Sequence, residues 1–137
     1  MQDIAEAIGL ERVATVVERF YARVRQHPTL ALPFARVHDW PQHLEYLTHF
    51  WWLTLGGKRY LHYNYAVGQK HAEAGFTPEL LVDWLALFRE VVSAELPPEL
   101  AAGWLERAEK IGESLRYMHT FQQANAGATP GKLYRPA

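Results

Sequence analysis

The stretch DWPQHLEYLTHFWWLTL, residues 39–55, combines the signals of a single helix with a dense cluster of aromatic side chains. Asp39 is a good N-cap, Pro41 is tolerated in a first helical turn, and the pair Gly56-Gly57 interrupts the pattern at the other end. We therefore predict a helix from residue 39 to residue 55. With about 3.6 residues per turn, one face of this helix carries a histidine among mostly apolar side chains, namely His43, Leu47, Phe50, Trp51 and Thr54.

A lone histidine on such a face is most simply a core residue held by a hydrogen bond. A second histidine, presented by a different element, would change that interpretation. His71 meets this condition, because it lies in the middle of a short helical segment predicted at residues 67–74 and closed by Gly75. Residues 43 and 71 are therefore the candidates for a metal site.

Helical periodicity covers most of the rest of the chain, and prolines and glycines separate its segments. Further helices are predicted at residues 3–8, 10–26, 78–95 and 98–124, with turn-rich connections at 27–38 and 56–68. Tyr21 falls at the edge of the apolar stripe of its helix, and spacing alone slightly favours a boundary tyrosine with its hydroxyl in water. The sequence contains no repeat and no alternating strand pattern, so the predicted class is all-α.

The length and composition of the chain narrow the range of possible functions. With 137 residues the chain suits one domain, predicted at residues 1–126, and the Gly/Pro-rich residues 127–137 suit a flexible tail. The net charge of -1, without a dense basic block, argues against nucleic acid as a partner. The N-terminal residues do not resemble a secretion signal, and no apolar run approaches the roughly 20 residues that span a bilayer. We expect a cytoplasmic protein without a membrane partner.

Cysteine is absent, which excludes disulfides, thiolate nucleophiles, iron–sulfur ligation and cysteine-attached haem. Five Trp, seven Tyr and six Phe predict a bulky core or a large apolar pocket. The predicted pocket has polar tips from Tyr21, His43 and Trp84, and its apolar walls come from Phe20, Phe34, Phe50, Trp51, Trp84 and Leu87. Such a pocket is too large for a bare zinc ion and suits a flat macrocycle such as haem, which needs only one axial imidazole from the protein.

Four motifs, taken in order, resemble the truncated haemoglobins, specifically group III, over about residues 10–123. These motifs are FYARVRQHPTLALPF at 20–34, WPQHLEYLTHFW at 40–51, YNYAVGQKH at 63–71 and WLALF at 84–88. The first is similar to the family's second helix with its distal tyrosine, and the second to its distal helix with its histidine. The third is similar to the approach to the proximal histidine, and the fourth carries the tryptophan on the ligand side.

The resemblance implies a truncated globin in which two helix pairs form a two-over-two sandwich around non-covalent haem b. His71 would be the iron ligand, Tyr21, His43 and Trp84 would face the bound ligand, and the remaining haem contacts would come from Phe34, Phe50, Trp51, Tyr63 and Leu87. The implied function is binding of O2, nitric oxide or another small diatomic ligand at the sixth iron position. Two donors to the ligand would slow its release. That property favours ligand storage or redox chemistry, such as nitric oxide oxidation or peroxide removal with an unidentified reductase, over simple oxygen transport.

Two other classes of protein remain as alternatives. A four-helix di-iron or hemerythrin-like protein needs inward carboxylates and Glu-x-x-His pairs, and the sequence offers only Glu45 and His49, four residues apart. A cofactor-free globin-like interaction or sensor module would not need His71. Whether the protein is an enzyme is left open by the sequence.

Overall fold

The computed structural model describes residues 4–63, 65–66, 69–70 and 74–126. Within these residues the regular structure is helical and there is no strand, which confirms the all-α prediction. The elements are α1 (Ile4–Ile8), α2 (Leu10–Val24), the short 3-10 helix η1 (Leu32–Phe34), α3 (Trp40–Thr54), α5 (Pro78–Glu95) and α6 (Pro98–Ala126). The predicted segment 67–74 is described in part: Gln69, Lys70 and Ala74 are helical, and His71 lies outside the described residues.

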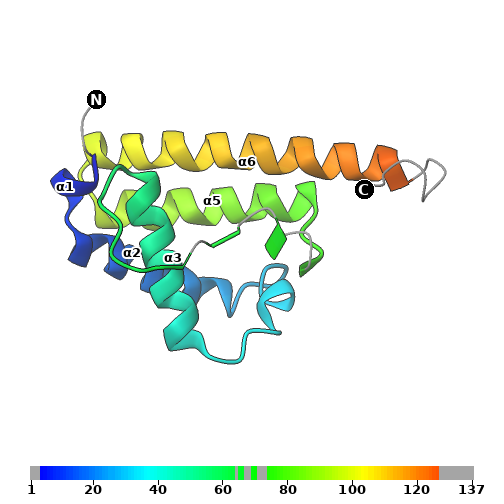
Figure 1. The fold of residues 1–137 in the computed structure, drawn as a ribbon, viewed down its shortest axis with the longest axis horizontal. Helices are drawn as coiled ribbons and strands as arrows, with labels where there is room; N and C mark the ends of the chain where they lie inside the picture. The colour runs from blue at the N-terminus through cyan, green and yellow to red at the C-terminus, as the bar shows by residue number, and fades with distance from the viewer. Residues whose placement is uncertain (1–3, 64, 67–68, 71–73, 127–137) are drawn as a thin grey trace.

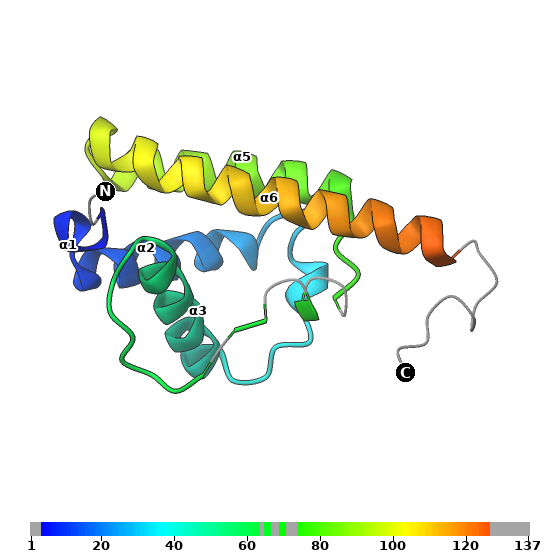
Figure 2. The same ribbon diagram turned by 45° about the horizontal axis from the view of Figure 1, so that its top comes forward.

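The two longest helices, α5 and α6, run antiparallel and side by side, as both ribbon views show (Figures 1 and 2). Helix α2 packs on α5, and α3 packs on α2 while crossing the α5–α6 pair steeply (Figure 1). The short α1 contacts both α2 and α6. The helices thus form the pairs α2–α3 and α5–α6. None of the described helices is both long enough and apolar enough to span a bilayer.

The helix boundaries follow the predicted signals closely. The Asp39 side chain accepts a hydrogen bond of 3.0 Å from the Gln42 backbone N–H, and the Thr77 hydroxyl accepts one of 3.2 Å from the Leu80 N–H. Caps of this kind stabilise a helix by about 1 kcal/mol each. Helix α5 has the predicted bounds, whereas α2 ends at Val24, two residues before the predicted end at residue 26.

A closed aromatic core joins α2, α5 and α6. Phe20, Phe88 and Trp104 are fully buried, and the Phe88 ring meets the other two edge-on at centroid distances of 4.9 and 5.6 Å. Complete burial of such side chains is worth roughly 1.5–3 kcal/mol each. The core therefore fixes how α5 and α6 stand relative to α2, and with them the position of the neighbouring cavity.

The residues that recur at helical spacing along α6, Trp104, Ala108, Ile111, Leu115 and Met118, are shielded from water along only part of the helix. Trp104 and Ala108 are buried and Ile111 and Leu115 are half-buried, but Met118 is exposed. Figures 1 and 2 show the reason, because the last turns of α6 extend past the beginning of α5. Residues with the same spacing therefore lose their packing partner where α5 stops.

Candidate functional site

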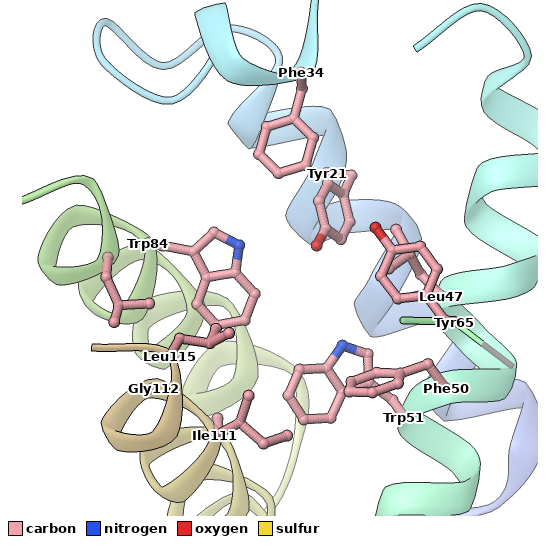
Figure 3. A pocket seen from close by; sticks show the side chains of 12 residues that line it. Tyr21, Phe34, Leu47, Phe50, Trp51, Tyr65, Trp84, Ile111, Gly112 and Leu115 are labelled. Carbon is pink, nitrogen blue, oxygen red and sulfur yellow. The ribbon is translucent and has the colours of Figure 1, made fainter. Parts of the chain in front are cut away.

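An apolar cavity lies between the α2–α3 pair and the α5–α6 pair (Figure 3). It encloses about 460 Å³ of space between atoms, a figure that includes open solvent at its mouth. Its walls are mostly aromatic and aliphatic: Tyr21, Phe34, Leu47, Phe50, Trp51, Tyr65, Leu81, Trp84, Ala108, Ile111, Gly112 and Leu115. The cavity thus takes side chains from all four long helices.

The polar atoms of several aromatic side chains point into this apolar space. The hydroxyls of Tyr21 and Tyr65 and the indole nitrogens of Trp51 and Trp84 all point into it (Figure 3). Tyr21 is only 4% exposed, so the sequence-based preference for a hydroxyl in water is wrong. The cause is packing, because the ring stands edge-on to Phe20 at 4.8 Å and to Phe34 at 5.4 Å and is closed in on both sides.

The Trp84 indole nitrogen is buried and has no hydrogen-bond partner within the described residues. An indole N–H can only donate, and leaving such a donor buried and unpaired costs roughly 1–3 kcal/mol. Because native structures contain few such groups, each one calls for an explanation. A ligand with an acceptor atom in the cavity would supply the missing partner.

The tyrosines keep their protons. Burial raises the pKa of Tyr21 far above its ordinary value, and the neighbouring Tyr65 raises it further. The Trp84 N–H lies near enough to offset this rise in part, although it does not reach hydrogen-bonding geometry. Burial, and then Tyr63, raises the pKa of Tyr65 to about 12. Near neutral pH the cavity therefore offers uncharged hydroxyl and indole donors.

His43 stands at the edge of the cavity, enclosed by aromatic rings. Its ring lies edge-on to those of Trp40, Tyr65 and Tyr21, with centroid distances of 5.2, 6.0 and 6.3 Å. Its Nε2 atom is buried without a partner in the described structure. Burial lowers the pKa of His43, and the charge of Lys70 lowers it further, so the ring is neutral near neutral pH.

A second, more open hollow adjoins the cavity and shares two of its walls, Phe34 and Tyr65. Its empty space of about 1,010 Å³ includes open solvent, and its lining contains His43, Tyr63 and Lys70. Phe34 and Tyr65 therefore border both spaces, and the outer one has the more polar lining.

The structure brings most of the predicted site residues together. Tyr21, Phe34, Phe50, Trp51 and Trp84 line the cavity, and His43 and Tyr63 line the adjoining hollow. Leu87 does not contribute to either, because it faces a separate groove between α2 and α5. Phe20, also predicted at the pocket, lies in the closed core behind Tyr21 and Trp84. The predicted iron ligand, His71, lies outside the described residues.

The sequence-based site omitted the wall that α6 provides. Ala108, Ile111, Gly112 and Leu115 were predicted only as parts of the α6 helix, although their spacing was visible in the sequence. Gly112 is explained by helix crossing, since a Cβ atom there would lie 3.1 Å from Leu85 Cδ1 of α5. The sequence showed that these positions face inward but not that they face an open space.

Unpaired nitrogen atoms do not by themselves mark this site. Trp104 Nε1 and Arg107 Nη1 are also buried without partners in the described part of the chain, and neither residue lines the cavity. The distinguishing feature is convergence, because Tyr21, Trp84 and His43 come from three different helices and meet in one region. Among the described residues there is no cluster of three His, Asp or Glu side chains able to hold a bare metal ion.

Comparisons with protein-family models, with curated proteins and with solved structures find no match for this chain.

Proposed function

We propose that the protein is a haem-binding globin of the truncated type, which binds O2 or another small diatomic ligand inside the cavity. One observation carries this proposal. Donor groups of Tyr21 from α2, Trp51 from α3 and Trp84 from α5 point into a single aromatic cavity, and His43 of α3 lines the hollow that adjoins it. Trp84 Nε1 and His43 Nε2 are buried without a partner among the described residues.

The arrangement of the helices supports the proposal. The packed pairs α2–α3 and α5–α6 face one another across the cavity, which is the relation required of a two-over-two sandwich. The inner cavity is apolar, which suits the body of a macrocycle, and the lining of the outer hollow is more polar and includes His43 and Lys70, which suits its charged edge. These features support haem b as the cofactor, and the absence of cysteine from the sequence excludes its attachment through thioether bonds.

The proposed iron ligand is His71, on the segment that follows Lys70. Haem would supply the iron position at which a diatomic ligand binds. Tyr21 and Trp84 would donate hydrogen bonds to an acceptor atom of that ligand, and neutral His43 would stand where the outer hollow meets the inner cavity. Phe34, Phe50 and Trp51 would exclude water, which strengthens the hydrogen bonds inside.

Two donors aimed at one small acceptor retain it, since each neutral hydrogen bond is worth about 0.5–1.5 kcal/mol. We therefore place the protein among ligand-storing or redox-active globins rather than simple oxygen carriers. Oxidation of nitric oxide or removal of peroxide, with electrons from a separate reductase, are the proposed reactions.

Titration of the purified protein with hemin tests the proposal. We expect one equivalent to bind, with a Soret band whose position differs among the ferric, ferrous and carbon monoxide forms. Leu115→Trp adds bulk to the cavity wall and should weaken binding at least about tenfold, an effect of roughly 1.4 kcal/mol. Tyr117→Trp is the matched control on the same helix, because Tyr117 is 72% exposed.

The outcomes separate the classes of protein. A chain that stays colourless with hemin would be a cofactor-free interaction or sensor module. Two irons per chain without a Soret band would indicate a di-iron protein. Equal hemin affinity of the Leu115→Trp and Tyr117→Trp variants would place haem outside the cavity.

A further inference from the structure

The segment that follows α3, residues 56–63, is bound back onto that helix by a histidine that has no role in the proposed function. His49 is 2% exposed, and its Nε2 atom accepts hydrogen bonds from the backbone N–H groups of Tyr60 and Leu61, both at 3.2 Å. Only an unprotonated ring nitrogen can accept. His49 is therefore neutral in this arrangement, with its proton on Nδ1.

A second attachment lies one turn further along α3 and does not titrate. The Trp52 indole N–H donates to the Lys58 carbonyl at 2.9 Å. The chain passes so close to this ring that a Cβ atom at Gly57 would lie 2.2 Å from it. The beginning of the segment is therefore fixed at every pH, whereas residues 60 and 61 depend on the protonation state of His49.

These attachments determine where the cavity wall begins. Tyr63 lies two residues after Leu61, and its ring stacks on that of Tyr46 at 3.9 Å. Tyr65 then lies edge-on to Phe50 at 5.8 Å and lines both the inner cavity and the outer hollow. Displacement of residues 60 and 61 would therefore shift the start of the chain that delivers Tyr65 to the wall.

We propose that His49 is a pH-sensitive latch, whose protonation releases the Tyr60 and Leu61 amides and loosens two side chains beyond them, Tyr63 in the outer hollow and Tyr65 in the wall of both spaces. The inference goes beyond the proposed haem function and does not depend on it, because each group concerned belongs to the protein. His49 acts as a positioning residue through the backbone that it holds.

The charges around His49 favour the neutral ring. Burial lowers its pKa below the ordinary 6.5, and the positive charge of Arg59 lowers it further. Arg59 stays nearby because its guanidinium donates to the carbonyls of Leu61 and Tyr63. The other titratable groups on the two elements that meet here are His43, Glu45 and Tyr46 of α3 and Lys58, Tyr60, His62 and Tyr63 of the segment. Of these, Glu45 acts on Tyr60, whose pKa is raised by burial and by that carboxylate.

The direction of the pH effect follows from these surroundings. A histidine whose pKa is lowered in the folded state stabilises its arrangement fully above the unfolded pKa of about 6.5. It loses that stabilisation as the pH falls through the folded value. The latch is therefore closed near neutral pH and opens as the pH falls through that lowered pKa.

Amide hydrogen exchange measured by NMR tests the latch in the whole protein without added ligand. Protection factors, in which the intrinsic pH dependence of exchange cancels, are measured between about pH 8 and about pH 5, on either side of the ordinary histidine pKa. The Tyr60 and Leu61 amides should lose protection by roughly ten- to a hundredfold on acidification, the range expected for two neutral hydrogen bonds. Amides in the middle of α6 should keep theirs, and nuclear Overhauser contacts between Tyr65 and Phe50 should weaken over the same pH range.

Three variants sharpen the test. His49→Gln retains an acceptor oxygen but does not titrate, so protection should persist at all these pH values. His49→Phe lacks the acceptor and should show low protection throughout. His62→Gln removes an exposed histidine of the same segment and should behave as the unaltered protein does. Protection that is independent of pH in the unaltered protein, or an unchanged pH dependence in His49→Gln, would overturn the inference even if His49→Phe did not fold.

Discussion

His43 and His49 lie on the same helix and both rings are largely withdrawn from water, yet their nitrogen atoms have opposite surroundings. His49 Nε2 accepts two backbone hydrogen bonds and anchors the following segment. His43 Nε2 is buried among three aromatic rings and has no partner among the described residues. The His49 ring stabilises the fold, whereas the His43 ring presents a nitrogen without a partner among the described residues at the edge of the cavity.

The same contrast separates two neighbours in the sequence. Phe20 is fully buried in a core that Phe88 and Trp104 complete, whereas Tyr21 turns its hydroxyl into the open space next to that core. The Phe20 side of α2 thus contributes stability, and the Tyr21 side contributes a donor. The difference shows that the cavity lies where close side-chain packing ends, next to a core that still fixes the positions of the surrounding helices.

The largest effect that we expect is loss of haem when His71 is removed. A comparison of His71→Ala with His43→Ala tests which of the two histidines is the iron ligand. His71→Ala should abolish tight hemin binding, while His43→Ala should retain it, because haem needs one axial imidazole and the proposal assigns that role to His71. Hemin titration followed by absorption spectroscopy measures both. A normal ferrous carbon monoxide spectrum of His71→Ala without added imidazole would assign the iron to another ligand.

The cavity should make the protein depend on its cofactor, in contrast to the closed core. A ligand that binds only the folded chain stabilises it by about 4 kcal/mol at a thousandfold excess over its Kd. We therefore expect the haem-loaded protein to melt roughly 10 °C or more above the apoprotein. Differential scanning calorimetry of both forms gives this difference. Equal Tm values would mean that the helices pack as well without haem, and the cavity would lose its proposed role.

The fold could be predicted further than the site, and particular residues show why. Helix α5 was predicted to the residue because Thr77, Pro78 and the stripe of Trp84 and Phe88 are local signals in the sequence. The end of the α6 stripe could not be predicted, since exposure of Met118 depends on where α5 stops. A local pattern gives the face of a helix, but the length of its partner decides how much of that face is covered.

Prediction of the site was limited in the same way, because the position of each side chain depends on residues that are distant in the sequence. Spacing placed Tyr21 at the edge of its stripe, and the rings of Phe20 and Phe34, one from a different element, decided that it is buried. Leu87 has the correct period but turns to another groove. The role of His49 was not visible at all, because its partners are backbone amides that any residue at positions 60 and 61 would provide.

The distal donors should control ligand release from the haem-loaded protein. Tyr21→Phe removes the hydroxyl while keeping the ring. O2 bound to haem would carry negative charge, and a hydrogen bond to a charged acceptor is worth about 1.5–3 kcal/mol, more than one to a neutral acceptor. The substitution should therefore speed O2 dissociation roughly ten- to a hundredfold. Carbon monoxide, a weaker hydrogen-bond acceptor, should respond less. Stopped-flow dissociation kinetics measure both rates. An unchanged O2 rate in Tyr21→Phe with a faster one in Trp84→Phe would make the indole the main donor, and no change in either would refute the ligand-retaining site.

The smallest effects concern the stability of the apoprotein and test the contrast between the two histidines directly. His49→Phe leaves the part-buried amides of Tyr60 and Leu61 without their acceptor, so it should lower the free energy of unfolding by roughly 1–3 kcal/mol near neutral pH, the worth of two neutral hydrogen bonds. His43→Phe removes a buried polar atom that has no partner among the described residues and adds a ring to an aromatic cluster, so its effect should be about zero or slightly stabilising. Urea denaturation near neutral pH measures both differences.

The pH dependence of these variants then completes the comparison. The pKa of each histidine is lowered in the folded protein, by burial first and then by a nearby cation, Lys70 for His43 and Arg59 for His49. Their neutral forms therefore contribute stability above about pH 6.5, and that stability is lost as the pH falls through the folded values. Each Phe variant should lose part of this acid sensitivity. A larger loss of stability from His43→Phe than from His49→Phe would show that His43 is the one with an essential protein partner, and the contrast between a structural and a functional histidine would fail.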